Sequence, residues 1–278
     1  MHRTLRVTLV PVLLALLAPA KPVRSGDAPN HLRLATTTSV DNSGLLPAIL
    51  PAFEEATGIH VDILAVGSGK ALELARRGDA DCVLAHSPAA EAKFVAEGYG
   101  LGRVTIMRNW FLVVGPAQDP AAIKGLTPLA AFKKLASADT RFVSRGDDSG
   151  THAKEKELWA RAGAKPAAEH YIEAGSGMAE TLTLANEKLA YTLTDNATYL
   201  KLHDHLELVP LVERGDELLN IYSAMWVNPE KAPGVRVDLA KQLVAWLASD
   251  AGQEAIGSYG VTGLHVFTPE HAVAATAK

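Results

Sequence analysis

The chain contains the same short pattern twice. In the first copy, an apolar run leads into the hydroxyl cluster 36–39, and a second apolar run ends in Gly67-Ser68-Gly69. In the second copy, residues 142–143 lead into the segment 145–151, which is rich in hydroxyls and glycine, and a later apolar run ends in Gly175-Ser176-Gly177. Helical patterns follow these loops. Because strands that alternate with helices form a parallel sheet covered by helices, the repeat predicts two similar α/β lobes.

Each predicted lobe offers two loops that suit a small anion. A loop between the end of a strand and the start of a helix presents free backbone N–H groups at the positive end of the helix dipole. Here the loops also carry hydroxyl groups, which are further hydrogen-bond donors. A cleft between two such lobes is therefore the predicted binding site of a small oxyanion.

The loop of the second lobe carries the most specific candidates. The planar guanidinium of Arg145 offers a fork of donors that suits a tetrahedral oxyanion. Ser149 and Thr151 add hydroxyl donors, and Gly150 lets the backbone approach a ligand closely. Asp147 is placed to hold the arginine in position. The alternative interpretation is that Asp148 or Ser149 only caps the following helix and that Arg145 is a solvated surface residue.

Three other loops supply further candidate ligand residues. Thr38 and Ser39 follow the first predicted strand, and Ser68 stands between two glycines where a helix is expected to begin. Ser176 and Gly177 form the matching loop of the second lobe, where backbone amides are the expected donors. Such residues are also common in plain turns and helix caps. The support for a ligand-binding role therefore comes from the recurrence of the pattern.

The predicted lobes are discontinuous in sequence. The first comprises residues 29–112 and 222–278, and the second comprises residues 113–221. The chain therefore crosses between the lobes twice, at the apolar runs near 110–114 and 221–227, and two crossings form a hinge. The expected fold class is α/β with a cleft between the lobes. A single doubly wound domain with insertions is the alternative.

Residues 1–20 have the features of a secretory signal peptide. Basic residues precede the apolar segment 7–17, which is too short to span a membrane comfortably, and Ala18-Pro19-Ala20 matches a cleavage site. The mature protein is therefore expected to be soluble in the periplasm after cleavage near Ala20.

Charge and cysteine content argue against several classes of protein. The formal net charge is −4 with histidines neutral, which argues against nucleic acid or an anionic membrane as the main partner. An anion site must therefore work by local geometry rather than through the overall field. The single cysteine, Cys82, rules out a disulfide framework, and its apolar surroundings predict a buried strand and a structural thiol.

No catalytic or cofactor site is predicted. Ser149 and His152 suggest a hydrolase only weakly, because the Gly-x-Ser-x-Gly motif is absent and no third orienting residue is evident. His203 and His205 lack a third ligand for a metal site. Neither Gly-Ser-Gly loop has the spacing of a phosphate loop or of a dinucleotide-binding fingerprint. A secreted hydrolase is therefore the distant alternative, and the protein is expected not to be an enzyme.

Five short segments are specific when taken together. They are 35–39 (Ala-Thr-Thr-Thr-Ser), 66–69 (Val-Gly-Ser-Gly), 78–81 (Gly-Asp-Ala-Asp), 144–152 (Ser-Arg-Gly-Asp-Asp-Ser-Gly-Thr-His) and 194–195 (Thr-Asp). Through them the chain resembles the extracytoplasmic tungstate-binding components of bacterial ABC transporters over essentially its whole mature length. The resemblance implies a type II periplasmic binding fold that delivers one oxyanion to a membrane permease. It also implies the ligand residues Thr38, Ser39, Ser68, Arg145, Ser149, Gly150 and Thr151. We further expect a monomer.

Four positions depart from the pattern of that family. Ser68 stands where threonine is usual and Lys70 where glutamine is usual. Trp110 stands where aspartate is expected, and Asn196 stands where arginine is expected. The choice between tungstate and molybdate therefore stays open. Molybdate, sulfate or phosphate on the same fold, and a sensor subunit that signals to a receptor kinase, are the remaining alternatives.

The acceptors in the loops discriminate among these anions. Phosphate keeps a proton near neutral pH, and that proton needs a hydrogen-bond acceptor, whereas tungstate is a bare dianion. A site made only of donors would leave the proton unpaired, which costs roughly 1–3 kcal/mol. Asp147 and Asp148 are the candidate acceptors. We expect neither to face the ligand, because each is better placed to orient Arg145 or to cap the helix.

Overall fold

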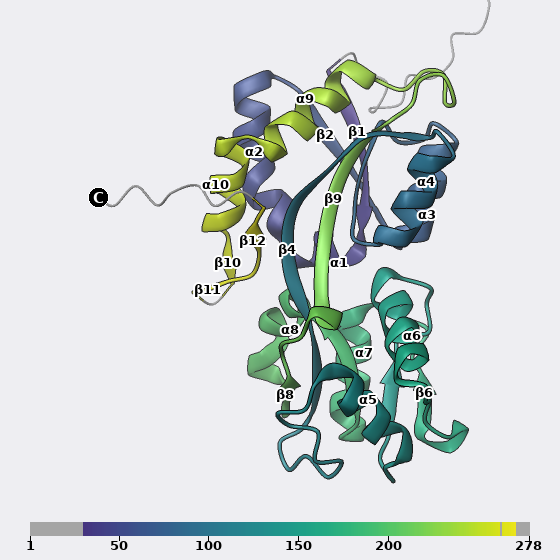
Figure 1. The fold of residues 1–278 in the computed structure, drawn as a ribbon. Coiled ribbons are helices and arrows are strands. Elements are labelled where there is room, and N and C mark those ends of the chain that lie inside the picture. Colours follow the sequence, from purple (N-terminus) through teal and green to yellow (C-terminus); the bar gives the residue numbers. More distant parts are fainter. Residues whose placement is uncertain (1–29, 262, 271–278) are drawn as a thin grey trace, which may run out of the picture.

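In the computed structural model, which describes residues 30–261 and 263–270, one long strand runs through two α/β lobes (Figure 1). This strand, β4 (Gly100–Pro116), pairs with β9 (Leu219–Val227) in the first lobe and with β7 (Tyr191–Asp195) in the second. The strand order is β2-β1-β3-β9-β4-β7-β5-β6, and β8 and β12 also pair with β4. The predicted signal peptide, residues 1–20, lies outside the described residues.

The first lobe is built around parallel strands from the N-terminal part of the chain. These are β1 (His31–Thr37), β2 (His60–Val66) and β3 (Cys82–Ala85), and β9 joins β3 in the antiparallel direction. The accompanying helices are α1 (Thr38–Ser43), α2 (Leu45–Thr57), α3 (Ser68–Arg76), α4 (Pro88–Ala96), α9 (Val237–Ala248) and α10 (Asp250–Ser258). The short strands β10 (Gly260–Val261), β11 (Leu264–His265) and β12 (Thr268–Pro269) follow α10.

The second lobe repeats this plan with the middle of the chain. β5 (Phe142–Ser144) pairs in parallel with β6 (Tyr171–Glu173) and β7, and β8 (Leu208–Val212) pairs with β4 in the antiparallel direction. The helices are α5 (Pro128–Ser137), α6 (Gly150–Ala162), α7 (Met178–Lys188) and α8 (Asn196–Leu202). Short 3₁₀ turns are η2 (Ala168–His170), η3 (His203–His205) and η4 (Asp216–Leu218).

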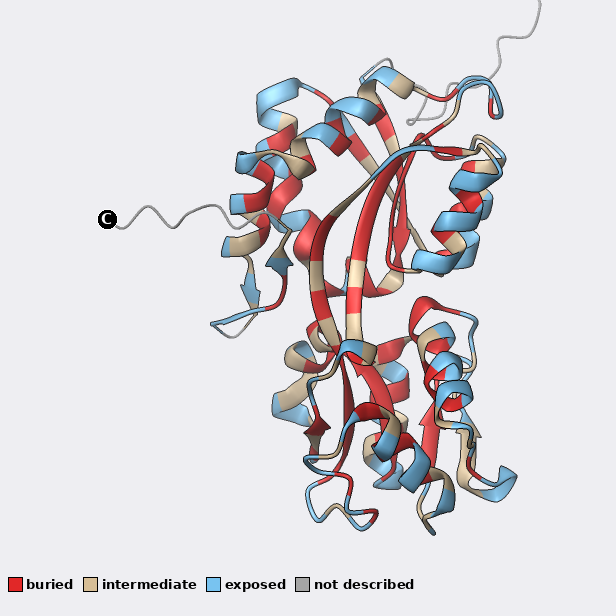
Figure 2. Ribbon diagram, viewed as in Figure 1, coloured by how far each residue is buried: buried red, intermediate tan, exposed pale blue. Residues whose placement is uncertain are grey.

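Each lobe has its own apolar core on both faces of its sheet. In the first lobe, Phe53 belongs to a cluster under α2, α9 and α10, and Phe94 belongs to a cluster under α3 and α4. In the second lobe, Phe132 lies in a cluster under α5 and α6, and Leu182 lies in a cluster under α7. Figure 2 shows the buried residues along the strands and on the helix faces that cover them. Largely separate cores allow the lobes to move about the connections between them, although Ala197 of α8 packs in the first-lobe cluster.

The structure confirms most predicted strands and helices of the repeat. Gly58 and Gly163 end α2 and α6 with positive φ angles of 68° and 64°. Cys82 is buried in β3, in agreement with a structural thiol. None of the helices in the described ranges is both long and apolar enough to cross a membrane.

One expectation about the fold is wrong. The sheet is mixed rather than parallel, because the crossing strands β4 and β9 run antiparallel to β7 and β3. In the hydroxyl cluster, the side chain of Thr37 accepts from the N–H of Val40 and caps the short helix α1, which is a common role of such residues. Helices α1, α5 and α8 were not predicted. Helices α1 and α8 are too short for an apolar period to show.

Candidate functional site

The two lobes contact each other where the first residues of α3 and α6 meet. Gly150 is the first residue of α6, and a Cβ atom placed on it would lie 3.0 Å from Ser68 Oγ and 2.9 Å from His86 Cε1. Ser68 begins α3, and His86 directly follows β3. The structure therefore brings a repeated loop of one lobe against a repeated loop of the other.

Polar groups without a partner are buried at this contact. Seven buried side-chain atoms among the described residues have no hydrogen-bond partner. Three of them are Ser68 Oγ, Arg145 Nε and Thr151 Oγ1, and these residues are 3%, 3% and 1% exposed. A buried polar group left unpaired costs about 1–3 kcal/mol, so such groups are rare in folded proteins. All three can donate hydrogen bonds, and they come from both lobes. This arrangement favours a ligand that accepts from all of them.

Arg145 is held in position by its own loop. Its Nη2 donates to Asp147 Oδ2, and Asp147 Oδ1 accepts from the backbone N–H of Ser149 at 3.1 Å. Asp147 therefore orients the guanidinium, as the sequence predicted. The charge of Arg145 also reaches the first lobe, where it contributes to a lowered pKa of His86.

Neither aspartate of this loop is placed as a free acceptor. Both oxygens of Asp147 already accept hydrogen bonds. The side chain of Asp148 is 88% exposed, and its Oδ1 accepts from Lys156 Nζ at 2.9 Å. These contacts support the expectation that a ligand in the interlobe site meets donors rather than carboxylates.

Two of the helices at the site begin without a side-chain cap. The N-cap residues of α3 and α7 are Gly67 and Gly177, which leave the first amides of these helices for another acceptor. In α6, by contrast, Ser149 Oγ accepts from the N–H of His152 at 3.3 Å. That bond uses the oxygen as acceptor and leaves the hydroxyl proton of Ser149 to donate, so capping and ligand binding are compatible.

A chain of hydrogen bonds links the first loop to the crossing strands. The hydroxyls of Thr37 and Ser39 are 3.0 Å apart, and Ser39 Oγ lies 2.9 Å from His86 Nε2. On the other side of the ring, His86 Nδ1 lies 2.9 Å from Asn220 Oδ1 on β9. Asn220 Nδ2 donates in turn to Asn109 Oδ1 on β4 at 2.9 Å. The chain of contacts thus connects a ligand loop with both strands that join the lobes.

His86 is neutral at physiological pH. Burial lowers its pKa to about 4, with a further contribution from the charge of Arg145, and the hydrogen bond to Asn220 opposes this shift only in part. Because the Asn220 oxygen can only accept, the ring proton is on Nδ1, and Nε2 accepts the hydroxyl proton of Ser39. The side chain of Ser39, predicted as a ligand donor, therefore donates to His86 in this arrangement.

The other predicted residues follow the carboxyl ends of neighbouring strands. Thr38 is the first residue of α1 and is half-buried, and Ser176 and Gly177 are half-buried in the loop before α7. That loop lies beside the arginine loop, because the N–H of Gly175 donates to the carbonyl of Arg145 at 2.8 Å. The predicted site residues of the second lobe therefore lie at one edge of its sheet.

Asp195 is a buried carboxylate near the site that the loop pattern does not reveal. It ends β7, and its two oxygens accept from the N–H and the hydroxyl of Thr198 at 2.9 and 2.8 Å. Burial raises its pKa, and these hydrogen bonds and the charge of Arg145 oppose that shift. Its one sequence signal is the Thr-Asp pair at 194–195. Asn109 and Asn220 have no comparable signal, since each is a single amide within a long strand.

A cleft of about 450 Å³ opens beside the contact between the lobes. It lies between the start of α4 and α6, and its lining residues are His86, Ser87, Pro88, Ala89, Gly150, Ala153, Lys154 and Glu157. Because it reaches both Gly150 and His86, this cleft leads from solvent toward the buried donors.

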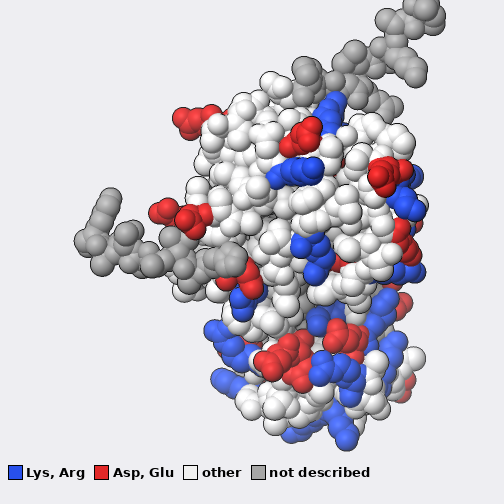
Figure 3. Space-filling model, turned by 45° about the horizontal axis from the view of Figure 1, so that its top comes forward, with Lys and Arg blue, Asp and Glu red and all other residues white. Residues whose placement is uncertain are grey.

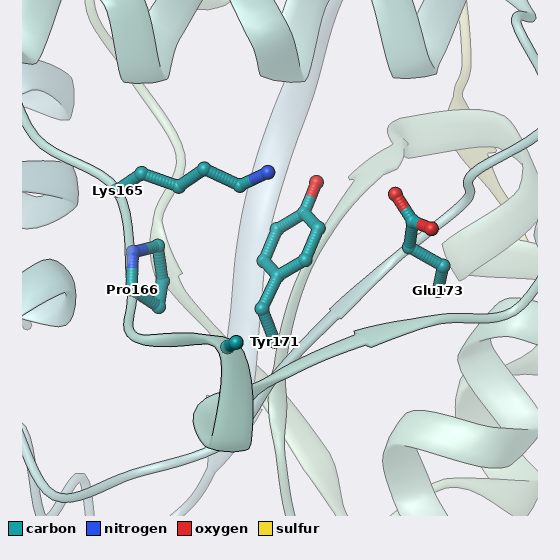
Figure 4. Close-up of a pocket in the computed structure, with 5 residues that line it drawn as sticks. Lys165, Pro166, Tyr171 and Glu173 are labelled. Carbon is teal, nitrogen blue, oxygen red and sulfur yellow. The ribbon is translucent and has the colours of Figure 1, made fainter.

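A second cavity, of about 430 Å³, lies in the second lobe and is less suited to an oxyanion. Its lining residues are Lys165, Pro166, Ala168, Tyr171 and Glu173. In Figure 4 the Lys165 ammonium points toward the ring of Tyr171, and its Nζ lies 4.1 Å from the ring centroid. The Tyr171 hydroxyl already donates to Glu155 at 2.6 Å, and Glu173 adds a negative charge. The contact between the lobes is therefore the better candidate.

Surface charge does not mark an anion site on the one face that Figure 3 shows. On the face shown in Figure 3, basic and acidic side chains are mixed over the second lobe, and neither sign forms a continuous field. The short-range donors between the lobes must therefore supply the attraction for an anion.

Substituting Gly150 by alanine should weaken ligand binding without destabilising the unliganded protein. The added Cβ would lie 2.9 Å from His86 Cε1 and 3.0 Å from Ser68 Oγ, so it would hold the lobes apart. Overpacking of this kind costs about 1–3 kcal/mol, which corresponds to about 5- to 160-fold in affinity. Calorimetric titration with tungstate, the anion that the sequence resemblance implies, measures the loss, and the melting temperature of the free variant checks the fold. Unchanged affinity would show that Gly150 does not lie this close to Ser68 and His86 in the liganded form.

Comparison with known proteins identifies the family. A family model described as a PBP superfamily domain matches residues 23–251. The tungstate-binding protein TupA of Peptoclostridium acidaminophilum is 43% identical over 260 residues, which cover 92% of this chain and 91% of that protein. The structure of the tungstate-binding protein TupA from Desulfovibrio alaskensis G20 is 45% identical, with a TM-score of 0.78, over 86% of this chain and 98% of that chain.

A further solved structure agrees with this assignment. The tungstate ABC transporter structure from Geobacter sulfurreducens is 45% identical, with a TM-score of 0.76, over 82% of this chain and 98% of that chain. These matches confirm the predicted two-lobed binding-protein fold and the predicted family, and they carry binding and transport names rather than enzyme names. The chain belongs to the PBP superfamily and, within it, to the family of the tungstate-binding proteins TupA.

Proposed function

We propose that this protein captures tungstate between its two lobes and delivers it to an ABC permease. The observation that carries the proposal is the group of unpaired buried polar atoms, Ser68 Oγ, Arg145 Nε and Thr151 Oγ1, which come from both lobes. A tetrahedral dianion can accept from all of them at once. The names of relatives that are 43% and 45% identical support tungstate as that anion.

The donors explain how binding would close the protein. Ser68 lies in the first lobe, whereas Arg145 and Thr151 lie in the second, so a single anion satisfies all three only when the lobes meet. A ligand that binds one conformation better shifts the population toward it. A contact outside the site also accompanies the closed form, since Lys201 Nζ in α8 donates to the carbonyl of Asn42 in α1 at 2.9 Å. The permease would then recognise the closed surface.

The same donors favour a fully deprotonated anion. His86 Nε2 accepts from Ser39, and the oxygens of Asp147 and Asp195 accept from neighbouring groups. The proton of hydrogen phosphate would therefore lie beside a donor, at a cost of roughly 1–3 kcal/mol. Tungstate and molybdate carry the same charge and differ little in size, so both should bind.

The remaining parts of the proposal concern the whole protein. We place the lobe boundaries at residues 29–112 with 222–278 and at residues 113–221. The apolar clusters largely support this division, although Phe111 and Leu112 pack in second-lobe clusters and Ala197 packs in a first-lobe cluster. Residues 1–20 would act as a signal peptide cleaved near Ala20. The mature protein would then work as a monomer in the periplasm.

Thermal unfolding with a panel of anions tests the proposed function. The mature protein is melted with tungstate, molybdate, sulfate and phosphate at equal concentration. A ligand at about 100 times its Kd adds about 2.7 kcal/mol of stability, or roughly 5–10 °C for a chain of this length. We expect this shift with tungstate and molybdate and a much smaller one with sulfate or phosphate. Equal shifts with all four anions, or none with tungstate, would contradict the proposal.

A further inference from the structure

A cluster of metal-ligating side chains lies at the far end of the first lobe from the anion site. His31 begins β1, and His60 and Asp62 lie at the start of β2 (Figure 1). The anion loops follow the opposite ends of these strands. Seven-residue strands separate their two ends by about 20 Å, so the two places are independent.

Strand pairing brings the three side chains together. β1 and β2 pair in parallel, with His31 opposite His60. Asp62 lies two residues beyond His60, so its side chain is on the same face of the sheet. The backbone ladder therefore places two imidazoles and a carboxylate next to one another.

The distances suit a small tetrahedral ion. One ligand atom of each residue lies within 4.8 Å of the others. His31 Nδ1 is 3.0 Å from Asp62 Oδ2, and His60 Nε2 is 3.8 Å from Asp62 Oδ1. An ion with ligands about 2.0–2.1 Å away holds the ligand atoms about 3.3–3.4 Å apart. The side chains of His60 and Asp62 are 55% and 27% exposed, so small rotations reach that spacing, and an ion can enter from solvent.

Glu54 provides the outer support that a metal-binding histidine uses. Its Oε1 lies 3.1 Å from His60 Nδ1 and also accepts from the N–H of Val61 at 2.9 Å. A carboxylate on one ring nitrogen fixes the tautomer and the orientation of the ring. Nε2 of His60 is then the nitrogen that faces Asp62.

We propose that His31, His60 and Asp62 bind a divalent transition-metal ion such as Zn²⁺, with Glu54 as the positioning residue for His60. Two imidazoles and one carboxylate are a ligand set that suits zinc, and water completes the coordination at this exposed place. The carboxylates of Asp62 and Glu54 balance the charge of the ion. Because β2 is the edge strand of the sheet, the ion would fasten that edge to β1.

Calorimetric titration of the mature protein with Zn²⁺ tests this proposal. The protein is first treated with EDTA and dialysed, and the buffer contains neither tungstate nor phosphate. We expect saturable binding of one equivalent, a raised melting temperature, and no comparable binding of Mg²⁺, which prefers oxygen ligands. His60→Gln and Asp62→Asn should each weaken binding at least tenfold, and Glu54→Gln should weaken it about 10- to 100-fold.

His170→Gln is the matched control. His170 Nε2 also lies near a carboxylate, 3.5 Å from Asp139 Oδ1, but in the second lobe and outside the three-residue cluster. This variant should bind Zn²⁺ as the unchanged protein does. The melting response to tungstate checks that each variant is folded. The absence of saturable Zn²⁺ binding, or binding that survives both His60→Gln and Asp62→Asn, would overturn the proposal.

Discussion

Replacing Arg145 by glutamine should weaken tungstate binding by about 10- to 150-fold, or ~1.5–3 kcal/mol. The guanidinium is buried, is oriented by Asp147 and has a free Nε at the contact between the lobes. Glutamine keeps a polar side chain but removes the charge and the planar fork of donors. Arg145→Lys keeps the charge alone and should give an intermediate loss. Calorimetric titration measures both.

Arg141→Gln is the control for this change. It removes the same charge from the same lobe, but Arg141 is exposed and lies outside the site. Its affinity for tungstate should match that of the unchanged protein, and so should its melting temperature. Full affinity in Arg145→Gln would show that the anion binds elsewhere.

Acidification from about pH 6.5 to about pH 4 should cost the folded protein about 3 kcal/mol through His86 alone. The pKa of this buried ring falls from 6.5 to about 4 on folding, mainly because of burial. Between these values the unfolded chain takes up a proton that the folded chain does not. The contribution of His86 to the free energy of unfolding is therefore fully present above pH 6.5 and decreases as the pH falls. Below about pH 4 it decreases no further.

Urea unfolding at several pH values measures this loss. His86→Gln should be less stable than the unchanged protein at pH 7.5, because it disturbs the contacts with Ser39 and Asn220, but its further loss on acidification should be smaller. His205→Gln is the control, since His205 is exposed, and it should lose stability with pH as the unchanged protein does. An equally steep loss in His86→Gln would assign the acid sensitivity to other groups.

The repeated pattern predicts much of the fold because its apolar runs and glycine-rich loops are typical of particular local structures. Strands such as β2 and β5, and the helices that begin after Gly67 and Ser149, follow from apolar periods and glycine-rich loops. The direction of β4 and β9 does not follow from them, since an apolar run predicts a strand but not the orientation of its neighbours. The mixed sheet is therefore a result of the two crossings.

The site is predictable where its residues stand together in the sequence. Arg145, Ser149 and Thr151 lie in one loop, and Ser68 stands between glycines, so their types and spacing indicate an anion. The hydrogen bond between His86 and Asn220, by contrast, joins residues that are 134 positions apart in the sequence. Neither has a neighbour in the sequence that indicates a role, and only the return of β9 beside β3 brings them together.

A crystal structure of the mature protein with tungstate, measured at the tungsten absorption edge, tests the interlobe site most directly. We predict one strong anomalous peak between the lobes, with the oxygens of the anion in hydrogen-bond contact with Ser68 Oγ, Thr151 Oγ1 and the guanidinium of Arg145. A peak elsewhere on the molecule, or an anion that contacts only one lobe, would contradict the proposed site.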